Sequence, residues 1–273
     1  MYGYGFRPNN GLFGGGGGGA SYLLDTYGSA KVAYSLHQLS STATLSCRVR
    51  RSSDNAEQDI GFVDGDLDTT SLLSFVGAGN GFVVKMYDQS GNANDALNST
   101  GSDQRFIVQS GALNLYPSSS VVTSLRQSVN SYLTLTTPFS QTSQHTTISV
   151  GNTTTGEFNG VNGNNAPVSC GTTTSRVLRY QASTVHNFGT LTVGNHIIGT
   201  YRQTDNTVRA FDNGSLFGSA ATGSTLSASN YIKIWDRNSN SNHYSSTVIL
   251  WELDLSANIT DLSTILNNHY GFY

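Results

Sequence analysis

From about residue 80 to the C-terminus, apolar residues come in short runs that are separated by polar turns. Runs of this length, rich in β-branched and aromatic residues, are typical of strands. From Gly81 onward they predict strands at FVVKMY (82–87), RFIVQ (105–109), YLTLTT (132–137), TTISVG (146–151), HIIGTYR (196–202), TVRAF (207–211), YIKIW (231–235) and STVILWELDL (246–255). Between two apolar residues in AFDNGSLF, Asn213-Gly214 predicts a two-residue hairpin turn.

Two segments in the first third show helical spacing instead. The stretch 29–41 begins with Ser29, a plausible N-cap, and predicts a short helix from the spacing of Val32, Leu36 and Leu39. Asp68 is expected to cap a second helix over residues 69–76, because two glycines, Gly77 and Gly79, then end the pattern.

A third helix is predicted close to the C-terminus. Ser256 or Asn258 can cap it, and Gly271 follows its last turn. Its apolar face consists of Ile259, Leu262, Ile265 and Leu266. We expect this helix to close one end of a β-sandwich.

Composition agrees with an all-β fold. The 273 residues include 30 Gly and only four Pro, which suits many short strands joined by tight turns. One main domain, residues 21–273, can bury a sizeable core, and no repeat of fixed period indicates a solenoid. With 11% charged residues and a net charge of −3, the chain has no basic field for nucleic acid or an anionic membrane. No secretion signal and no apolar run long enough for a membrane span are expected.

The first 20 residues differ from the rest, because six consecutive glycines, Gly14 to Gly19, cannot belong to a packed element. Two interpretations stay open. The segment is either an idle terminus or an anchoring arm, whose docking residues are then Tyr2, Tyr4, Phe6, Arg7 and Phe13. Aromatic residues anchor interfaces well, so we favour the arm.

Candidate metal and thiol chemistry is sparse. Cys47 and Cys170 are expected as free thiols, with one disulfide between them as the alternative. The six histidines show no metal-ligand spacing, so no metal or cofactor is predicted. For the acidic stretch DGDLD (64–68) a metal site is an alternative, but helix capping explains its Asp68 without an ion. The Arg48, Arg50 and Arg51 cluster lies near Asp54, Glu57 and Asp59, which favours internal ion pairs.

The stretch MYDQSGNAND (86–95) ends a strand in a cluster of side-chain oxygens. The spacing of these oxygens is that of a calcium loop, but Ala93 and Ser99 stand where an EF-hand has Gly and Glu. Three interpretations stay open: a turn in which Asp88 and Ser90 bond to backbone N–H groups two residues on, a sugar contact, and an irregular metal site. The structural turn is preferred.

Two motifs in order carry a family resemblance. RVRRSSDNAEQDIGFV (48–63) followed by GFVVKMYDQSGNANDA (81–96) resembles the N-terminal half of the α-L-arabinofuranosidase B catalytic domain, over residues 22–110. The remainder is similar to concanavalin A-like and laminin G-like jelly rolls. The combination looks like that of tailed-bacteriophage virion proteins such as head fibres, capsid decorations and tail spikes.

The resemblance implies a two-sheet jelly-roll β-sandwich displayed on a phage particle. Its partners would be other virion proteins and a host surface glycan, its location the virion surface, and its oligomeric state a homo-oligomer such as a trimer. In the arabinofuranosidases a Glu acts as nucleophile, yet the corresponding stretch 179–195 has no Asp or Glu. Asp236, in IWDRNSNSN (234–242), resembles the family's acid/base residue and is a weak catalytic candidate.

We therefore expect carbohydrate binding without hydrolysis, because glycoside cleavage needs two carboxyl groups. Aromatic faces and fixed polar groups hold sugars, and the candidate contacts are Trp235, Asp236, Asn238, Tyr87, Asp88, Gln89 and Asn92. For Trp235 a place in the core is the alternative. The other functions considered are an active glycosidase that degrades host polysaccharide, and a cement protein without a ligand.

Overall fold

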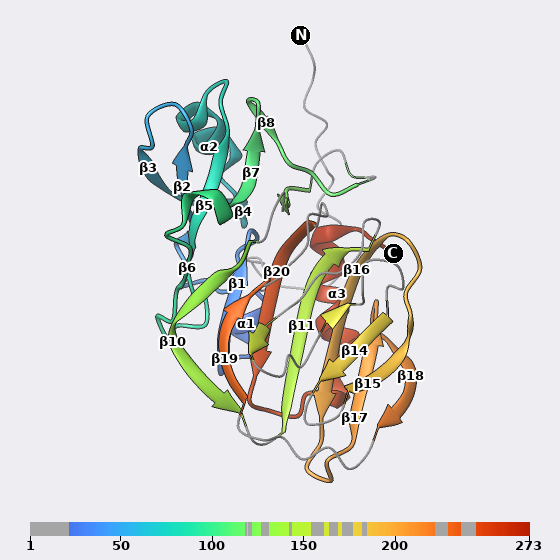
Figure 1. Cartoon of the computed structure of the whole chain (residues 1–273). Coiled ribbons are helices and arrows are strands. Elements are labelled where there is room, and N and C mark those ends of the chain that lie inside the picture. The colour runs from blue at the N-terminus through green and yellow to red at the C-terminus, as the bar shows by residue number, and fades with distance from the viewer. Residues whose placement is uncertain are drawn as a thin grey trace, which may run out of the picture.

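The computed structural model describes residues 22–117, 119, 122–126, 131–141, 144–153, 161–163, 169–170, 177–181, 185–221, 229–235 and 244–273. They form an all-β sandwich with a few short helices, as predicted (Figure 1). The expected anchoring arm, residues 1–20, lies outside the described residues. The division at residue 20 and the concanavalin A-like connectivity stay predictions.

One layer is an antiparallel sheet in the order β1-β20-β11-β16-β17-β18. Its long central strands run side by side in Figure 1. The strands are β1 (Ala30–Ser35), β20 (Tyr244–Trp251), β11 (His145–Asn152), β16 (Asn195–Arg202), β17 (Val208–Asp212) and β18 (Ser215–Ala221).

The other layer starts with the antiparallel order β3-β2-β5, after which the first half of β5 pairs with β7 and its second half with β6. The layer continues from β6 through β10 to β19 and β12. These strands are β2 (Leu45–Arg51), β3 (Glu57–Val63), β5 (Gly81–Met86), β6 (Ala96–Leu97), β7 (Arg105–Gln109), β10 (Leu133–Gln141), β12 (Val161–Gly163) and β19 (Ser229–Ile234).

Short elements complete the chain. The two-residue strand β9 (Leu125–Arg126) pairs with both β7 and β20, and so joins the layers. A separate small sheet holds β13 (Ser169–Cys170), β14 (Val177–Gln181) and β15 (Val185–Thr190). The remaining pieces are β4 (Asp66–Leu67), β8 (Ala112–Leu113) and the 3-10 turns η1 (Gly101–Asp103) and η2 (Ser256–Asn258).

Two hydrophobic cores share the strands β1 and β20. Val32 and Tyr34 of β1 face the first core, between the layers, whereas Ala33 faces the second. On β20, Val248 and Leu250 belong to the first core, while Ile249 and Trp251 belong to the second. Both faces of these two strands are therefore buried.

The C-terminal helix α3 (Ile259–Tyr270) packs against a face of the first sheet, on the opposite side from β10 and β19 (Figure 1). Its residues Ile259, Leu262 and Leu266 are buried together with the short helix α1 (Leu23–Thr26). Gly271 ends the helix with a left-handed φ of 63°, as predicted. The expectation that this helix closes an end of the sandwich is wrong, because it covers a face.

Several local predictions are confirmed. The helix α2 (Thr69–Val76) is capped by Asp68, whose Oδ1 accepts a hydrogen bond of 2.9 Å from the Ser71 N–H. Asn213 and Gly214, with φ of 50° and 79°, form the turn between β17 and β18.

The predicted helix within 29–41 is wrong, since residues 30–35 form the strand β1. A strand that is buried on both faces lacks the alternation of apolar and polar residues that marks a half-exposed strand. The apolar residues Val32 and Leu36 are four positions apart, and this spacing puts two residues on the same face of either a strand or a helix.

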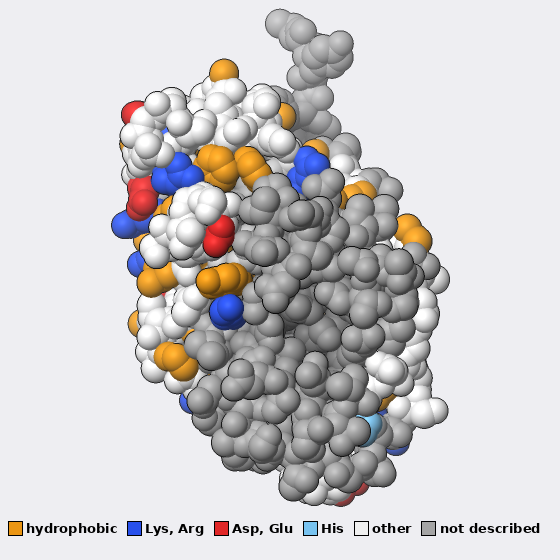
Figure 2. Space-filling model, in the orientation of Figure 1, with side chains coloured by type: hydrophobic (Ala, Val, Ile, Leu, Met, Phe, Trp, Pro, Cys, Tyr) orange, Lys and Arg blue, Asp and Glu red, His pale blue; other side chains and the backbone are white. Residues whose placement is uncertain are grey.

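Charge and thiol predictions can be checked on the described residues. Arg48 pairs with Asp59 at 2.6 Å and Arg51 with Asp54 at 2.7 Å, as expected. Lys, Arg, Asp and Glu side chains are interspersed on the described part of the face in Figure 2. Cys47 is a buried free thiol, and burial raises its pKa to about 12. No described helix is long and apolar enough to cross a membrane.

A first prediction concerns Gly199 in the middle of β16. A Cβ at this position would lie 2.0 Å from the Thr147 carbonyl oxygen and 2.3 Å from the Phe211 ring. The backbone of a central strand cannot move away from its neighbour, so Gly199→Ala should lower the free energy of unfolding by about 3 kcal/mol, the upper end of the usual cost of overpacking. Urea denaturation measures this change.

Gly28→Ala is the matched control, because the nearest atom to its Cβ would be the Leu24 carbonyl oxygen at 3.5 Å. It should change stability by less than about 0.5 kcal/mol. Equal stability of the two variants would show that the packing of β11, β16 and β17 is described wrongly.

Candidate functional site

The turn that follows β5 is built around the carboxylate of Asp88. Oδ1 accepts hydrogen bonds from the N–H groups of Ala33 at 2.9 Å and Ser90 at 3.0 Å. Oδ2 accepts one from the Ser90 hydroxyl at 2.8 Å and one from the Asn94 N–H at 3.1 Å. Burial is the largest influence on this carboxyl and raises its pKa, although the hydrogen bonds act in the opposite direction.

The same turn supplies partners to the edge of β1 that does not pair with β20. Gln89 donates its N–H to the Ala33 carbonyl at 2.8 Å and its side-chain amide to the Ser35 carbonyl at 2.9 Å. Asn92 donates its amide to the Ala30 carbonyl at 2.9 Å. Side chains and the Gln89 N–H thus replace a neighbouring strand, and the preferred interpretation of MYDQSGNAND as a structural turn is confirmed.

A hollow of about 500 Å³ opens beside this turn. We call it the Asn92 hollow, and its lining is Ser29, Ala30, Lys31, Ser90, Asn92, Asn94, Thr137, Phe139 and Glu252. The ammonium of Lys31 lies 3.5 Å from Glu252 Oε2 and 5.5 Å from the centre of the half-buried Phe139 ring. Asn92 is exposed, and its Oδ1 accepts no hydrogen bond from the described residues.

The structure separates the residues that were predicted to contact a sugar. Among the described members of this set, only Asn92 lines the hollow, whereas Asp88 and Gln89 hold the turn. Tyr87 donates its hydroxyl to Asp59 at 2.7 Å, and burial together with this hydrogen bond raises its pKa to about 12. Asp236, Asn238 and the docking residues Tyr2, Tyr4, Phe6, Arg7 and Phe13 lie outside the described residues.

Trp235 lies in the first core with 1% of its surface exposed, which agrees with the alternative considered for it. An indole buried in this way presents no open face for a sugar. Its φ of 53° is unusual for a bulky residue. Arg105 fixes this conformation by donating to the Trp235 carbonyl at 2.5 Å.

Spacing in the sequence did not reveal the other hollow residues. Lys31 stands in the segment that was predicted to be a helix, Phe139 follows a predicted strand, and Glu252 lies within one. The available signal was a charged residue, Glu252, inside an otherwise apolar run.

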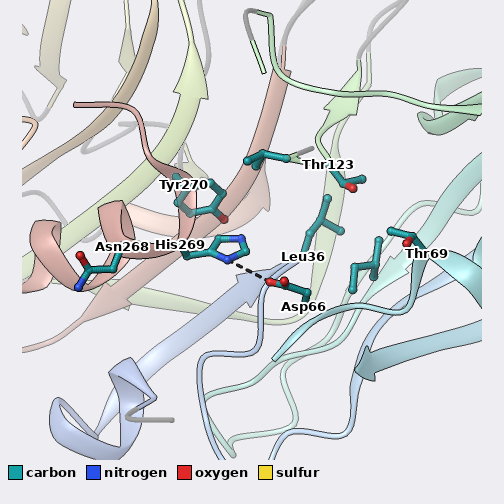
Figure 3. A pocket seen from close by; sticks show the side chains of 9 residues that line it. Leu36, Asp66, Thr69, Thr123, Asn268, His269 and Tyr270 are labelled. Carbon is teal, nitrogen blue, oxygen red and sulfur yellow. Dashed lines mark ion pairs between the residues drawn. The ribbon is translucent and has the colours of Figure 1, made fainter. Parts of the chain in front are cut away.

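A second cavity, of about 300 Å³, lies where β1 ends beside the hairpin of β3 and β4 and the last turn of α3 (Figure 3). We call it the Asp66 pocket, and its lining is Leu36, Asp66, Leu67, Thr69, Val122, Thr123, Asn268, His269 and Tyr270. In Figure 3, His269 points toward Asp66 across the pocket, and their Nδ1 and Oδ1 atoms are 3.1 Å apart.

His37 joins this pair from the side of β1. Its Nδ1 lies 3.4 Å from the same Oδ1 of Asp66, and its ring stacks on that of His269 with centres 3.8 Å apart. Partial desolvation beside the pocket raises the pKa of the Asp66 carboxyl, but the two histidines outweigh it and hold that pKa well below its usual range. Residues 37, 66 and 269 are far apart in sequence, so no spacing could have predicted their meeting.

No protein-family model matches the chain, and no characterised protein sequence matches it. Similar solved structures exist. A GH54 α-L-arabinofuranosidase soaked with a cyclic sulfate inhibitor has a TM-score of 0.61 and 12% identity, covering 87% of this chain and 62% of its own. An arabinofuranosidase complexed with arabinofuranosyl-α-1,2-xylobiose has a TM-score of 0.55 and 13% identity, covering 86% and 62%.

The chain thus spans about 62% of the length of these structures. At such low identity the similarity shows the fold alone, which is a β-sandwich of the kind found in these glycosidases. The predicted resemblance to arabinofuranosidases is confirmed at this level.

A second prediction tests the turn. In Asp88→Asn the side chain keeps its shape, but an amide NH₂ replaces one carboxylate oxygen. This NH₂ faces hydrogen-bond donors and cannot accept hydrogen bonds from them. The two hydrogen bonds to that oxygen are then lost at a largely buried carboxyl. The free energy of unfolding, measured by chemical denaturation, should therefore fall by about 2–3 kcal/mol.

Asp64→Asn is the control, because Asp64 is exposed and its positive φ of 52° is one that Asn adopts readily. Its effect should stay below about 0.5 kcal/mol. A neutral Asp88→Asn variant would exclude Asp88 as the centre of the turn.

Proposed function

We propose that this protein binds a carbohydrate in the Asn92 hollow. The observation that carries the proposal is the fold similarity to arabinofuranosidases over 87% of the chain. Those structures are complexes of enzymes with an inhibitor or with an arabinofuranosyl oligosaccharide. A ligand of the same class, a glycan that contains pentofuranosyl units, is the first candidate for this chain.

The chemistry of the hollow supports this ligand class. Sugar rings have an apolar C–H face and a rim of hydroxyl groups, so they need an aromatic surface and fixed polar groups. The half-buried Phe139 ring supplies the surface. The Oδ1 of Asn92 can accept from a hydroxyl, and the Lys31–Glu252 pair offers a donor and an acceptor at its 3.5 Å contact.

Glycoside hydrolysis is the second candidate function, and the fold similarity favours it because the compared structures are hydrolases. Hydrolysis needs two carboxyl groups on either side of the scissile bond, about 5–10 Å apart. Among the described residues that line the hollow, Glu252 is the carboxylic acid. Asp236, the weak catalytic candidate, and Glu157 lie outside the described residues.

Display on a phage particle is a further part of the proposal. It rests on the sequence resemblance to virion proteins and on the aromatic and glycine-rich residues 1–20. In this setting residues 1–20 bind other virion proteins, the sandwich faces outward as a homo-oligomer, and the hollow contacts a host surface glycan. A cement protein without a ligand is the alternative.

A third prediction concerns binding in the hollow. In calorimetric titration with arabino-oligosaccharides, Phe139→Ala should weaken binding about tenfold, because an aromatic contact contributes about 1 kcal/mol or more. Glu252→Gln keeps the shape of the side chain and should also weaken binding. Leu216→Ser, at an exposed position on β18 with 62% of its surface accessible, should bind like the wild type.

The same oligosaccharides, incubated with the wild-type protein, distinguish binding from cleavage. Binding without release of arabinose supports the proposal as stated. Release that is abolished by Glu252→Gln or Asp236→Asn establishes the hydrolase instead. Absence of both binding and release from arabinan and host polysaccharide rejects a carbohydrate function.

A fourth prediction concerns the arm. Deletion of residues 1–19 should leave a folded domain, with unchanged circular dichroism and thermal midpoint, that no longer joins the particle in an assembly assay. A full-length variant with Tyr2, Tyr4, Phe6 and Phe13 replaced by Ser should fail to assemble in the same way. Normal assembly of both proteins would contradict the anchoring role.

A further inference from the structure

Three segments that are distant in sequence bring two imidazoles and a carboxylate together at the Asp66 pocket. His37 follows β1, Asp66 begins β4, and His269 lies in the last turn of α3. One ligand atom from each residue lies within 4.8 Å of those from the other two. The cluster is separate from the Asn92 hollow, whose lining includes none of these residues.

The backbone around the cluster is fixed before any ligand arrives. His37 and Asp66 form an antiparallel β-bridge, and the Gln38 N–H donates to the Gly65 carbonyl at 2.8 Å. Asp64 and Gly65, with φ of 52° and 85°, make the two-residue turn that places Asp66. On the helix side, Ser246 donates its hydroxyl to that of Tyr270 at 2.9 Å, next to His269.

We propose that His37, Asp66 and His269 form a binding site for a divalent transition metal ion such as Zn²⁺. Neutral imidazole nitrogens and a carboxylate oxygen are preferred ligands of Zn²⁺ and of neighbouring first-row ions. Ca²⁺ and Mg²⁺ prefer oxygen ligands throughout, so two histidines select against them.

The distances from Asp66 to the two histidines fit a tetrahedral ion. Zn–N and Zn–O bonds of about 2.0–2.1 Å require ligand atoms to be about 3.3–3.4 Å apart. The Nδ1 atoms of His269 and His37 lie 3.1 Å and 3.4 Å from Asp66 Oδ1. The two imidazole rings stack with their planes 18° apart and cannot both direct a lone pair at one ion in this arrangement. One ring must therefore turn out of the stack for all three atoms to enter the coordination shell.

One polar atom of the cluster lacks a good partner without an ion. Nδ1 of His37 is buried and makes no hydrogen bond of good geometry with the described residues, despite its contact with Asp66. A buried polar atom without a partner costs free energy. Coordination of a metal ion through this nitrogen removes that cost.

The site has three protein ligands and opens into a cavity of about 300 Å³. A fourth position is thereby left for water or a small ligand, with the hydroxyls of Thr69 and Thr123 on the pocket wall (Figure 3). The ion would also link the last turn of α3 to β1 and β4, so it should stabilise the attachment of the C-terminal helix.

Titration of the metal-free, full-length protein with ZnCl₂ tests the proposal. Calorimetry should give one ion per chain, with binding of Zn²⁺ at least about 100-fold tighter than that of Mg²⁺. At 100 times the dissociation constant, Zn²⁺ should raise the thermal midpoint by about 5–10 °C, and EDTA should reverse the rise.

Two variants remove single ligands. His269→Ala and Asp66→Asn should each weaken Zn²⁺ binding by more than about 30-fold, a loss at least equal to that from an outer-shell partner. The matched controls are His186→Ala, a half-buried histidine on β15, and Asp64→Asn, two residues before Asp66. Both controls should bind Zn²⁺ like the wild type.

Because Asp66 has 66% of its side chain exposed, Asp66→Asn should stay folded even if His269→Ala does not. Circular dichroism checks both. Absence of stoichiometric Zn²⁺ binding to the wild type overturns the proposal. Zn²⁺ binding that is retained by a folded Asp66→Asn variant also overturns the proposal, because the ion then lies at another site. The carbohydrate assays are independent of these results.

Discussion

The fold depends on how the free edge of one buried strand obtains its hydrogen bonds. Both faces of β1 are covered, by the first core through Val32 and Tyr34 and by the second through Ala33. One edge pairs with β20. Backbone groups on the other edge cannot rely on water, and an unpaired buried group is costly. The side chains of Asp88, Gln89 and Asn92 supply these partners.

This arrangement explains why part of the structure could be predicted and part could not. The cap at Asp68 and the turn at Asn213-Gly214 depend on residues close in sequence, so local chemistry suffices to predict them. The strand β1 depends on burial by distant segments, and its apolar spacing indicated a helix instead. The Asp64-Gly65 pair is typical of a two-residue hairpin turn, and it forms the turn between β3 and β4. The turn was not predicted, because the stretch 64–68 was interpreted as helix capping.

Tertiary contacts also decide the roles of the candidate site residues. Trp235 is the strongest aromatic candidate in the sequence, yet a left-handed backbone at this residue directs it into the core. Lys31, Phe139 and Glu252 come from three strands or strand ends and converge only in the folded chain. His37 and His269 meet in the same way. The two cavities lie at opposite ends of β1, since Lys31 lines one and Leu36 the other.

The second motif that resembles arabinofuranosidases therefore has a structural role in the sandwich. Its Asp88 carboxylate oxygens accept hydrogen bonds from backbone N–H groups. Among the described residues, the hollow beside this turn is where we propose that a carbohydrate binds. Crystals soaked with an arabinofuranosyl oligosaccharide test this account most directly. We predict a sugar ring against Phe139, with a hydroxyl group within hydrogen-bond distance of Asn92 Oδ1. Sugar density at another surface, with the hollow occupied by water alone, would contradict the account.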